Sequence, residues 1–229
     1  MLHLASRMRS TLLVVSLVCS ANALAGSALG APLKVACVGD SITQVSGWPE
    51  RLRAKLGADY TVSNYGVTGS TILTHGDHPY VTTLRYRDSL HANPDVVVIM
   101  LGTNDSKPAN WNRHNGEFIR DYMTLVDSYA ALPSHPRIYL VLCPPAGKND
   151  GQISGATIER EVNPRIGKVA VAKRLQVIDI FSAFGGHNFD SKLFGPGDEV
   201  HPNTTGAERI ADAVYAAHLR QRARTRPTR

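Results

Sequence analysis

The 229-residue chain is poor in cysteine, has no acidic residue near its N-terminus and contains no long apolar run. Its three cysteines are too few for a disulfide scaffold. The apolar segments are too short to cross a bilayer, so we expect no stable membrane insertion. Hydrophobic residues still make up 43% of the chain and charged residues 19%. This balance argues against a disordered chain and predicts one globular domain with a full core.

The N-terminal segment lacks negative charge, because no acidic residue precedes Asp40. Arg7 and Arg9 come before the apolar residues 11–19, and small residues follow them. This order is typical of a secretory signal peptide, here residues 1–25, with cleavage after Ala25 or, as an alternative, after Ala31. We therefore expect a secreted or periplasmic protein. An uncleaved membrane anchor is the competing interpretation.

The basic excess is confined to the two ends of the chain. The formal net charge is +6, but seven arginines lie in the first ten or the last ten residues. The rest of the chain carries 18 basic and 19 acidic side chains. Such a neutral body predicts no nucleic-acid partner. Residues 220–229 form a basic tail that we expect to be solvated and disordered, although binding to a polyanion or an acidic cell surface is an alternative.

Predicted strands and helices alternate along the remaining chain. The strands are expected at residues 33–38, 60–64, 95–101, 137–142 and 176–180. The helices are expected at residues 48–56, 85–92, 117–132 and 158–173, the last broken near Asn163 and Pro164, with a final helix around 207–215. This alternation predicts an α/β domain over residues 32–219, with a five-stranded parallel sheet covered on both sides. We expect a flavodoxin-like three-layer α/β/α fold with strand order 2-1-3-4-5.

Cys37 and Cys143 both fall on predicted strands that are separated by one other strand. Two strand spacings amount to roughly 9.6 Å, whereas a disulfide needs α-carbons within roughly 7 Å. Two buried free thiols are therefore expected.

Polar residues follow four of the predicted elements at the edge where ligands bind in such sheets. Ser41, Gly69 and Asn104 come after the first three strands, and Asp198 and His201 precede the last helix. Each has an ordinary explanation as a turn former or a helix cap. Together, however, they supply every group that acyl transfer requires.

A serine hydroxyl needs a base and an oxyanion needs donors. His201 can accept the Ser41 proton if Asp198, one predicted helical turn earlier, holds its ring in one tautomer. The candidate oxyanion donors are the backbone N–H groups of Ser41 and Gly69 and the side-chain amide of Asn104. The Gly-x-Ser-x-Gly elbow of α/β hydrolases is not present, because Thr43 replaces its second glycine.

Ser41, Gly69, Asn104 and His201, in this order and with these surroundings, resemble the four blocks of the SGNH/GDSL hydrolases over about residues 34–218. The resemblance implies the SGNH hydrolase fold, Ser41 as nucleophile, His201 as base and Asp198 as the orienting acid. Ile42 stands where the family usually has leucine. Glu199 stands where relatives often have glycine, and there it either tightens the loop or adds negative charge beside His201.

The segments GDHPY (76–80) and LGTNDSKPANW (101–111) resemble the subgroup that removes acetyl groups from carbohydrates, including sialate O-acetylesterases and acetylxylan esterases. This resemblance implies a small acyl pocket and a polysaccharide or small-molecule ester as substrate. The candidate substrate contacts are Asp40, Asp105, Trp111 and His75. Trp111 either stacks on a sugar or is buried under its loop. His75 and His78 have metal-ligand spacing, but no third ligand is evident, so no metal and no cofactor are expected.

The sequence thus predicts a secreted serine esterase acting on O-acetyl groups of carbohydrate. Two alternatives remain: a short-chain lipid, aryl-ester or thioester hydrolase, and a sugar-binding module without catalytic activity. The sequence leaves the oligomeric state undefined.

Overall fold

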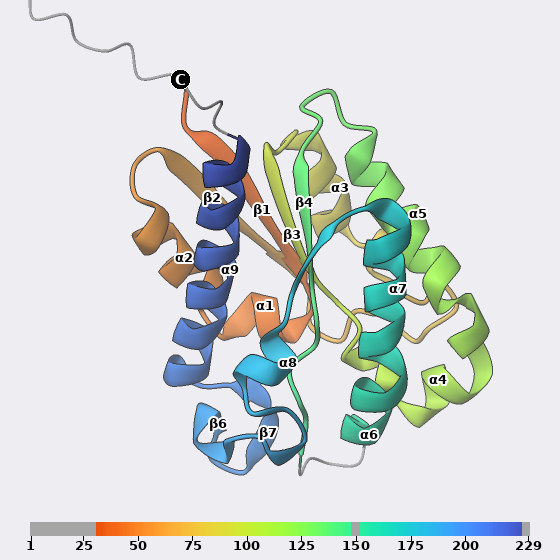
Figure 1. The fold of residues 1–229 in the computed structure, drawn as a ribbon. Helices are drawn as coiled ribbons and strands as arrows, with labels where there is room; N and C mark the ends of the chain where they lie inside the picture. Colours follow the sequence, from red (N-terminus) through yellow and green to blue (C-terminus); the bar gives the residue numbers. More distant parts are fainter. Residues whose placement is uncertain (1–30, 148–151, 226–229) are drawn as a thin grey trace, which may run out of the picture. The chain divides into compact units, whose positions relative to one another are not determined.

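Five parallel strands form the centre of the structure, a computed structural model that describes residues 31–147 and 152–225 (Figure 1). The strands lie in the order β2-β1-β3-β4-β5, which confirms the predicted topology. They span β1 Leu33–Gly39, β2 Tyr60–Gly66, β3 Val96–Met100, β4 Arg137–Val141 and β5 Gln176–Ile178. The predicted signal peptide, residues 1–25, lies outside the described residues.

Side chains alternate between the two faces of the sheet and feed two separate cores. From β1, Ala36 and Val38 pack on one face, whereas Val35 and Cys37 pack on the other. All five residues of β3 are buried, as expected for a strand covered on both sides. The three-layer arrangement that the alternation of elements predicted is therefore present.

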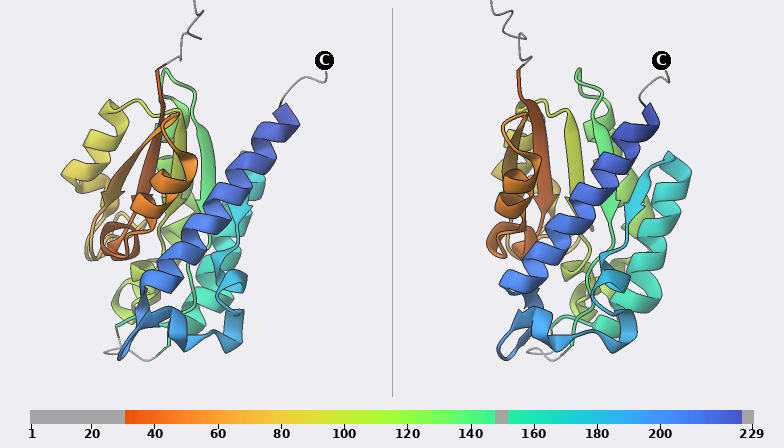
Figure 2. Two further views of the ribbon diagram at one scale, coloured as in Figure 1. Left: turned by 90° about the vertical axis from the view of Figure 1, so that its left-hand side faces the viewer. Right: turned by 60° about the vertical axis from the view of Figure 1, so that its left-hand side comes forward.

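One face of the sheet is covered by helices α3 (Leu84–His91), α5 (Phe118–Ala130) and α7 (Asn163–Lys173). The other is covered by α2 (Trp48–Leu56), α8 (Ile180–Ala183) and α9 (Thr204–Thr225), as the two side views show (Figure 2). None of the described helices is long and apolar enough to cross a membrane.

Two predicted features of the helices need correction. The helix before β5 is not interrupted at Pro164; a π-helical turn, Ile158–Val162, runs directly into α7, which tolerates proline in its first turn. Helix α9 continues through Thr225 into the predicted disordered tail. Residues 220–225 contain good helix formers and no proline, so nothing in them stops the helix. Residues 226–229 lie outside the described part.

Cys37 and Cys143 are buried free cysteines, as predicted. Cys143 lies just beyond β4 rather than on it. Its backbone N–H donates to Asn163 Oδ1 at 2.9 Å, and its carbonyl accepts from Asn163 Nδ2 at 3.0 Å. The side chain of Asn163 thus takes over the hydrogen bonds that a neighbouring strand would otherwise supply.

The carboxyl ends of the first three strands are in register. Gly39 at the end of β1 pairs with Gly66 of β2 and with Met100 of β3. The loops that follow these strands therefore begin side by side. A small antiparallel hairpin formed by β6 (Phe194–Gly195) and β7 (Asp198–Pro202) lies at the same end of the molecule (Figure 1).

Candidate active site

Ser41 is the first residue of a short helix, α1 (Ser41–Val45), that begins immediately after β1. Asp40 caps this helix, because its Oδ1 accepts from the Ile42 N–H at 2.9 Å. The turn also needs a residue without a side chain at position 39, since a Cβ on Gly39 would lie 2.8 Å from the carbonyl oxygen of Met100. The strand end therefore presents Ser41 at the carboxyl edge of the sheet, and its N–H belongs to the first helical turn, which has no intrahelical acceptor.

The side chains of Ser41, His201 and Asp198 form a continuous hydrogen-bonded chain. His201 Nε2 lies 2.9 Å from Ser41 Oγ, and His201 Nδ1 lies 2.7 Å from Asp198 Oδ2. The two outer residues come from α1 and β7 and are 157 positions apart in sequence. The structure thus brings the three predicted catalytic residues together in the predicted order.

The carboxylate of Asp198 is well suited to remain ionised. Partial burial favours its neutral form, but the bonds from the His201 ring and from the N–H groups of Val200 and His201 favour the carboxylate more strongly. The pKa of Asp198 is therefore lower than its usual value. An ionised Asp198 can accept a hydrogen bond from the N–H at His201 Nδ1, which leaves Nε2 unprotonated and facing Ser41.

Asn104 and Gly69 reach the same pocket from the next two loops. Asn104 begins a 3₁₀ turn after β3, and its Nδ2 is buried with no hydrogen-bond partner among the described residues. Gly69 has a φ of +80°, a conformation that a residue with a side chain rarely adopts. A buried donor left unpaired costs free energy, so an unpaired amide at a pocket wall indicates a group awaiting a ligand.

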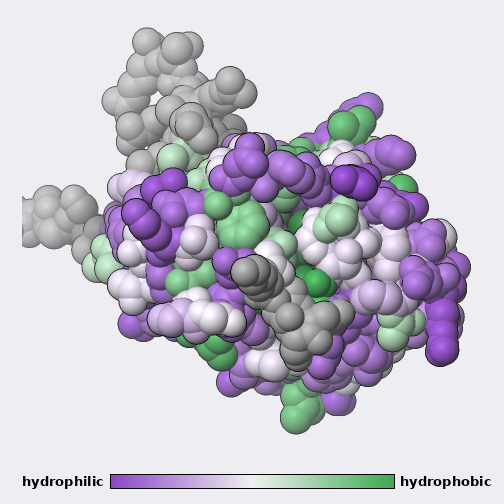
Figure 3. Space-filling model, turned by 90° about the horizontal axis from the view of Figure 1, so that it is seen from below, coloured by the Kyte–Doolittle hydropathy of each residue, from purple (hydrophilic) through white to green (hydrophobic). Residues whose placement is uncertain are grey.

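The pocket is a cavity of about 500 Å³, within the usual range for small-molecule sites. Its lining combines Ser41, Thr68, Gly69, Thr103, Asn104, Lys107, Gln152, Ile153, Gly197, Asp198, Val200 and His201. Thr68, Thr103, Gln152 and Ile153 are lining residues for which the sequence predicted no role. The visible part of the face at this end of the molecule is hydrophilic around its rim, and apolar residues lie among hydrophilic ones nearer its centre (Figure 3).

None of the four predicted substrate contacts lines this pocket. Asp105 is fully buried, and its two oxygens accept from the N–H groups of Ile72 and Leu73 at 3.0 and 2.8 Å. Asp40 is likewise buried and serves as the cap of α1. Both residues were predicted to contact substrate, but both carboxylates turn inward and accept from backbone N–H groups.

The pKa values of these two carboxyl groups are raised because the groups are buried. Burial raises the pKa of Asp40 to about 6, despite the opposing effects of the Ile42 N–H and of His201. Burial also raises the pKa of Asp105 to about 7, against its two backbone bonds and with added repulsion from Asp40. Both residues therefore position the site rather than line it.

Trp111 and His75 also lie away from the pocket lining. Trp111 is buried on α4 (Pro108–His114) against Phe118, so the buried alternative for this residue is the one observed. His75 is exposed and contacts Glu117, with 2.7 Å between Nδ1 and Oε2. His78, which has metal-ligand spacing to His75 in the sequence, instead contacts the carbonyl of Thr68.

Gln44 is a positioning residue that the sequence analysis missed. Its Oε1 accepts from both the backbone N–H and the hydroxyl of Thr68, at 2.7 and 2.6 Å. This ties the loop that carries Gly69 to α1, which carries Ser41. Glutamine on a helix is common and gave no signal in the sequence, because its partner is 24 residues away.

Comparison with known proteins places this chain in a family. Residues 37–209 match the GDSL-like Lipase/Acylhydrolase family. The chain belongs to this family, which confirms the predicted resemblance to the SGNH/GDSL hydrolases.

One curated relative supports a narrower likeness. The chain is 35% identical over 210 residues to an acetylxylan esterase of Xylanibacter ruminicola. The match covers 81% of this chain and 43% of that esterase, so the chain corresponds to less than half of its relative's length.

Solved structures share the fold. A carbohydrate acetylesterase from Sinorhizobium meliloti superposes with a TM-score of 0.67 at 19% identity, covering 82% of this chain and 99% of that one. A putative arylesterase from Agrobacterium tumefaciens gives a TM-score of 0.64 at 23% identity, covering 82% of this chain and 99% of that one. At these identities the likeness establishes the fold alone.

Proposed function

We propose that this protein is a serine esterase that removes small acyl groups, chiefly O-acetyl groups, from carbohydrate. The observation that carries the proposal is the chain of contacts from Asp198 through His201 to Ser41, at 2.7 and 2.9 Å, beside the unpaired amide of Asn104. Similarity to an acetylxylan esterase supports acetyl as the acyl group and carbohydrate as the leaving group.

In this mechanism Ser41 Oγ attacks the ester carbonyl while its proton passes to His201 Nε2. The resulting oxyanion accepts hydrogen bonds from the N–H groups of Ser41 and Gly69 and from Asn104 Nδ2. The carbon–oxygen bond to the sugar then breaks, and the sugar hydroxyl leaves with the proton from His201. Water, deprotonated by His201, attacks the acyl-serine, and the proton returns to Ser41 as the acid is released.

The pocket supports a small acyl group and a polar leaving group. Ile153 and Val200 are the large aliphatic residues in its lining, whereas Lys107, Gln152 and Thr103 are polar. The large hydrophobic side chains that are exposed in the described residues, Leu33, Val45, Leu84 and Val171, do not line this cavity. A long acyl chain would therefore find little apolar surface there.

The direct test is a substrate panel with the purified full chain and its Ser41→Ala variant. The panel contains p-nitrophenyl acetate, acetylated xylan, O-acetylated sialic acid and p-nitrophenyl esters of increasing chain length. We expect acetate release from the acetylated carbohydrates and nearly none from the variant. A clear preference for long acyl chains would favour a lipid hydrolase instead. Absence of hydrolysis of every ester would favour a sugar-binding module.

We also propose that the enzyme is exported. The proposal rests on the arginines, apolar segment and small residues of positions 1–25. Expression of the full gene in a Gram-negative host, followed by N-terminal sequencing of the exported protein, tests it. A mature chain that begins at Gly26 is the expected result, and a product retained in the cytoplasm with its first residues intact would contradict it.

A further inference from the structure

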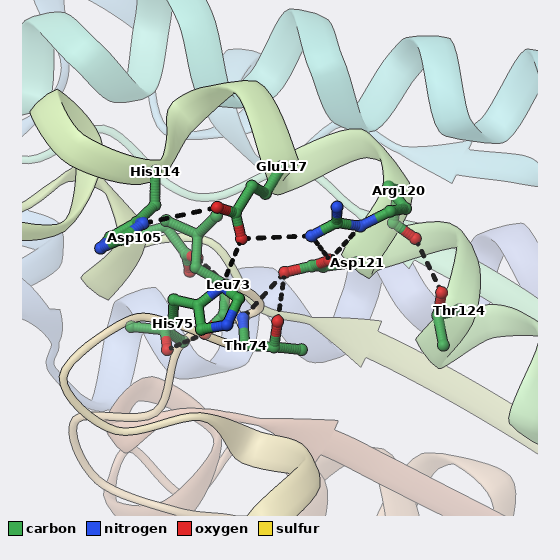
Figure 4. A network of polar contacts seen from close by, with 10 residues as sticks. Leu73, Thr74, His75, Asp105, His114, Glu117, Arg120, Asp121 and Thr124 are labelled. Atoms are coloured by element: carbon green, nitrogen blue, oxygen red, sulfur yellow. Dashed lines mark hydrogen bonds and ion pairs between the residues drawn. The ribbon is translucent and has the colours of Figure 1, made fainter.

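Three side chains of types that can ligate a metal ion lie close together outside the active site. His75 lies in the loop after β2, His114 ends α4, and Glu117 ends the short 3₁₀ turn Asn115–Glu117 (Figure 4). His75 Nδ1 lies 2.7 Å from Glu117 Oε2, and His114 Nδ1 lies 3.5 Å from Glu117 Oε1. One potential ligand atom from each residue lies within 4.8 Å of the other two.

The donor set is one that divalent zinc and its neighbours favour. Zinc binds imidazole nitrogen and carboxylate oxygen at about 2.0–2.2 Å, and two histidines with one carboxylate leave a fourth position for water. Atoms that share such an ion tetrahedrally lie roughly 3.4 Å apart. The two observed contacts, at 2.7 and 3.5 Å, reach the two different oxygens of Glu117, so this carboxylate faces both imidazole rings at close range. The remaining distance, between a ring nitrogen of His75 and one of His114, is at most 4.8 Å.

The backbone that carries His75 is already held against the elements that carry its partners. Asp121 on α5 accepts from both the N–H and the hydroxyl of Thr74, each at 2.8 Å. The neighbouring Leu73 N–H donates to the buried carboxylate of Asp105. Two carboxylates therefore fix the loop immediately before His75, so little ordering entropy would be lost on binding an ion.

The positive charge of Arg120 would repel a cation at this site, but two carboxylates already pair with it. Its guanidinium donates to Glu117 Oε2 at 3.1 Å and to Asp121 Oδ1 at 3.0 Å. Asp121 thus balances Arg120, which leaves the Glu117 carboxylate with uncompensated negative charge facing two imidazoles. The bond from Arg120 would also orient Glu117, as hydrogen bonds to metal-binding carboxylates commonly do.

We propose that His75, His114 and Glu117 form a binding site for a divalent transition-metal ion of the zinc type. The ion would link the loop that follows β2, which carries His75, to the segment between α4 and α5, which carries Glu117. It takes no part in ester hydrolysis in this proposal, so the site stands whether or not the proposed substrate is correct. Among the described residues, this is the one group of three such side chains whose ligand atoms approach so closely.

The chain offers a matched control in His187. This exposed histidine contacts Glu159, with 3.0 Å between Nδ1 and Oε2, in a pair that resembles His75 and Glu117. The described residues place no third ligand with it. A genuine three-ligand site must therefore respond to loss of His75, His114 or Glu117 and ignore loss of His187.

The test uses the full chain, prepared without a polyhistidine tag and stripped of metal. Co²⁺ serves as a spectroscopic probe and Zn²⁺ as its competitor. We expect one equivalent of Co²⁺ to give the visible absorption of a low-coordinate site, which Zn²⁺ abolishes. Each of His75→Ala, His114→Ala and Glu117→Gln should weaken binding by about tenfold or more, and His187→Ala should leave it unchanged.

A thermal-unfolding measurement provides the second readout. Zn²⁺ should raise the unfolding midpoint of the wild type and of His187→Ala, since a ligand that binds only the folded state stabilises it. It should not raise that of the three site variants. The His75 side chain is 65% exposed, so its removal keeps the test valid if another variant fails to fold. Weak binding that is equal in all variants, or loss confined to one of the three, would overturn the proposal.

Discussion

Asp198 and His201 lie three residues apart on a β-strand, and their side chains are nevertheless bonded at 2.7 Å. The expected helical turn between them is not present. Instead Asp198 Oδ1 accepts from the N–H groups of Val200 and His201, at 2.9 and 3.2 Å. These two hydrogen bonds bend the backbone at the start of β7 around the carboxylate, so that Oδ2 lies within hydrogen-bond distance of the imidazole. Glu199 lies between them in sequence, but its carboxylate lies beside Gly147, where a Cβ on that glycine would clash with Glu199 Oε2.

Replacement of Asp198 should therefore damage both the turn and the base. We expect Asp198→Ala to lower kcat strongly but by roughly tenfold to a hundredfold less than Ser41→Ala, because His201 remains although it is no longer oriented. Initial rates on p-nitrophenyl acetate measure both losses. Asp198→Asn retains the size of the side chain but presents an amide to His201. If this variant kept wild-type turnover, the orienting role would be refuted.

The unpaired amide of Asn104 makes a separate prediction about turnover. Asn104→Ala should lower kcat by about a hundredfold to a thousandfold with little change in KM, since the donor acts on the oxyanion of the transition state. Asn112→Ala, an exposed asparagine on α4, is the matched control and should keep full activity. Steady-state kinetics of both variants decide the matter. Full activity in Asn104→Ala would remove this residue from the oxyanion hole.

The two hydrogen bonds between the Asn163 side chain and the Cys143 backbone predict an effect on stability. Asn163→Ala would leave the buried N–H and carbonyl of Cys143 without their side-chain partners. We expect the free energy of unfolding to fall by about 1–3 kcal/mol, with Asn112→Ala close to wild type. Urea denaturation followed by circular dichroism measures the change. A loss no larger than that of the control would show that other groups satisfy Cys143.

The strands and the position of Ser41 at a strand end were predictable because local patterns determine them. The apolar run of β3 and the Gly39-Asp40-Ser41 turn carry their own signals, and the parallel topology follows from alternation of strands and helices. The strand order then places Ser41, Gly69 and Asn104 at one edge. Physical rules of this kind act over short stretches or on whole elements, so a single sequence is enough to apply them.

The features that escaped prediction depend on partners far away in sequence. The β6–β7 hairpin joins a two-residue strand to a five-residue strand through Pro196 and Gly197, and its short first strand gives almost no periodic signal. Gln44 acquires its role only when Thr68 is placed beside it. His75 was paired with His78 by spacing, whereas the fold supplies His114 and Glu117. In each case the contact is tertiary, and composition or periodicity cannot reveal it.

Buried Asp105 leads to a prediction about the pH dependence of stability. Its pKa is about 7 in the folded protein, whereas an unfolded aspartate has a pKa of about 3.9. Between these values the folded state holds a proton that the unfolded state has lost. The contribution of Asp105 to the free energy of unfolding is therefore largest below about pH 4, falls as the pH rises to about 7, and is constant above that. Asp40, with its pKa raised to about 6, acts in the same direction.

Asp105→Asn removes the titrating group and keeps one oxygen to accept from Ile72 or Leu73. We expect its free energy of unfolding to decline less than that of the wild type between about pH 5 and about pH 8. The variant also relieves the repulsion on Asp40, which flattens the dependence further. Asn112→Ala changes no titrating group and should keep the wild-type slope. Urea denaturation at several pH values provides the slopes. Equal slopes for wild type and Asp105→Asn would mean that the Asp105 carboxyl does not take up its proton on folding, and the bonds to Ile72 and Leu73 would then have to outweigh its burial.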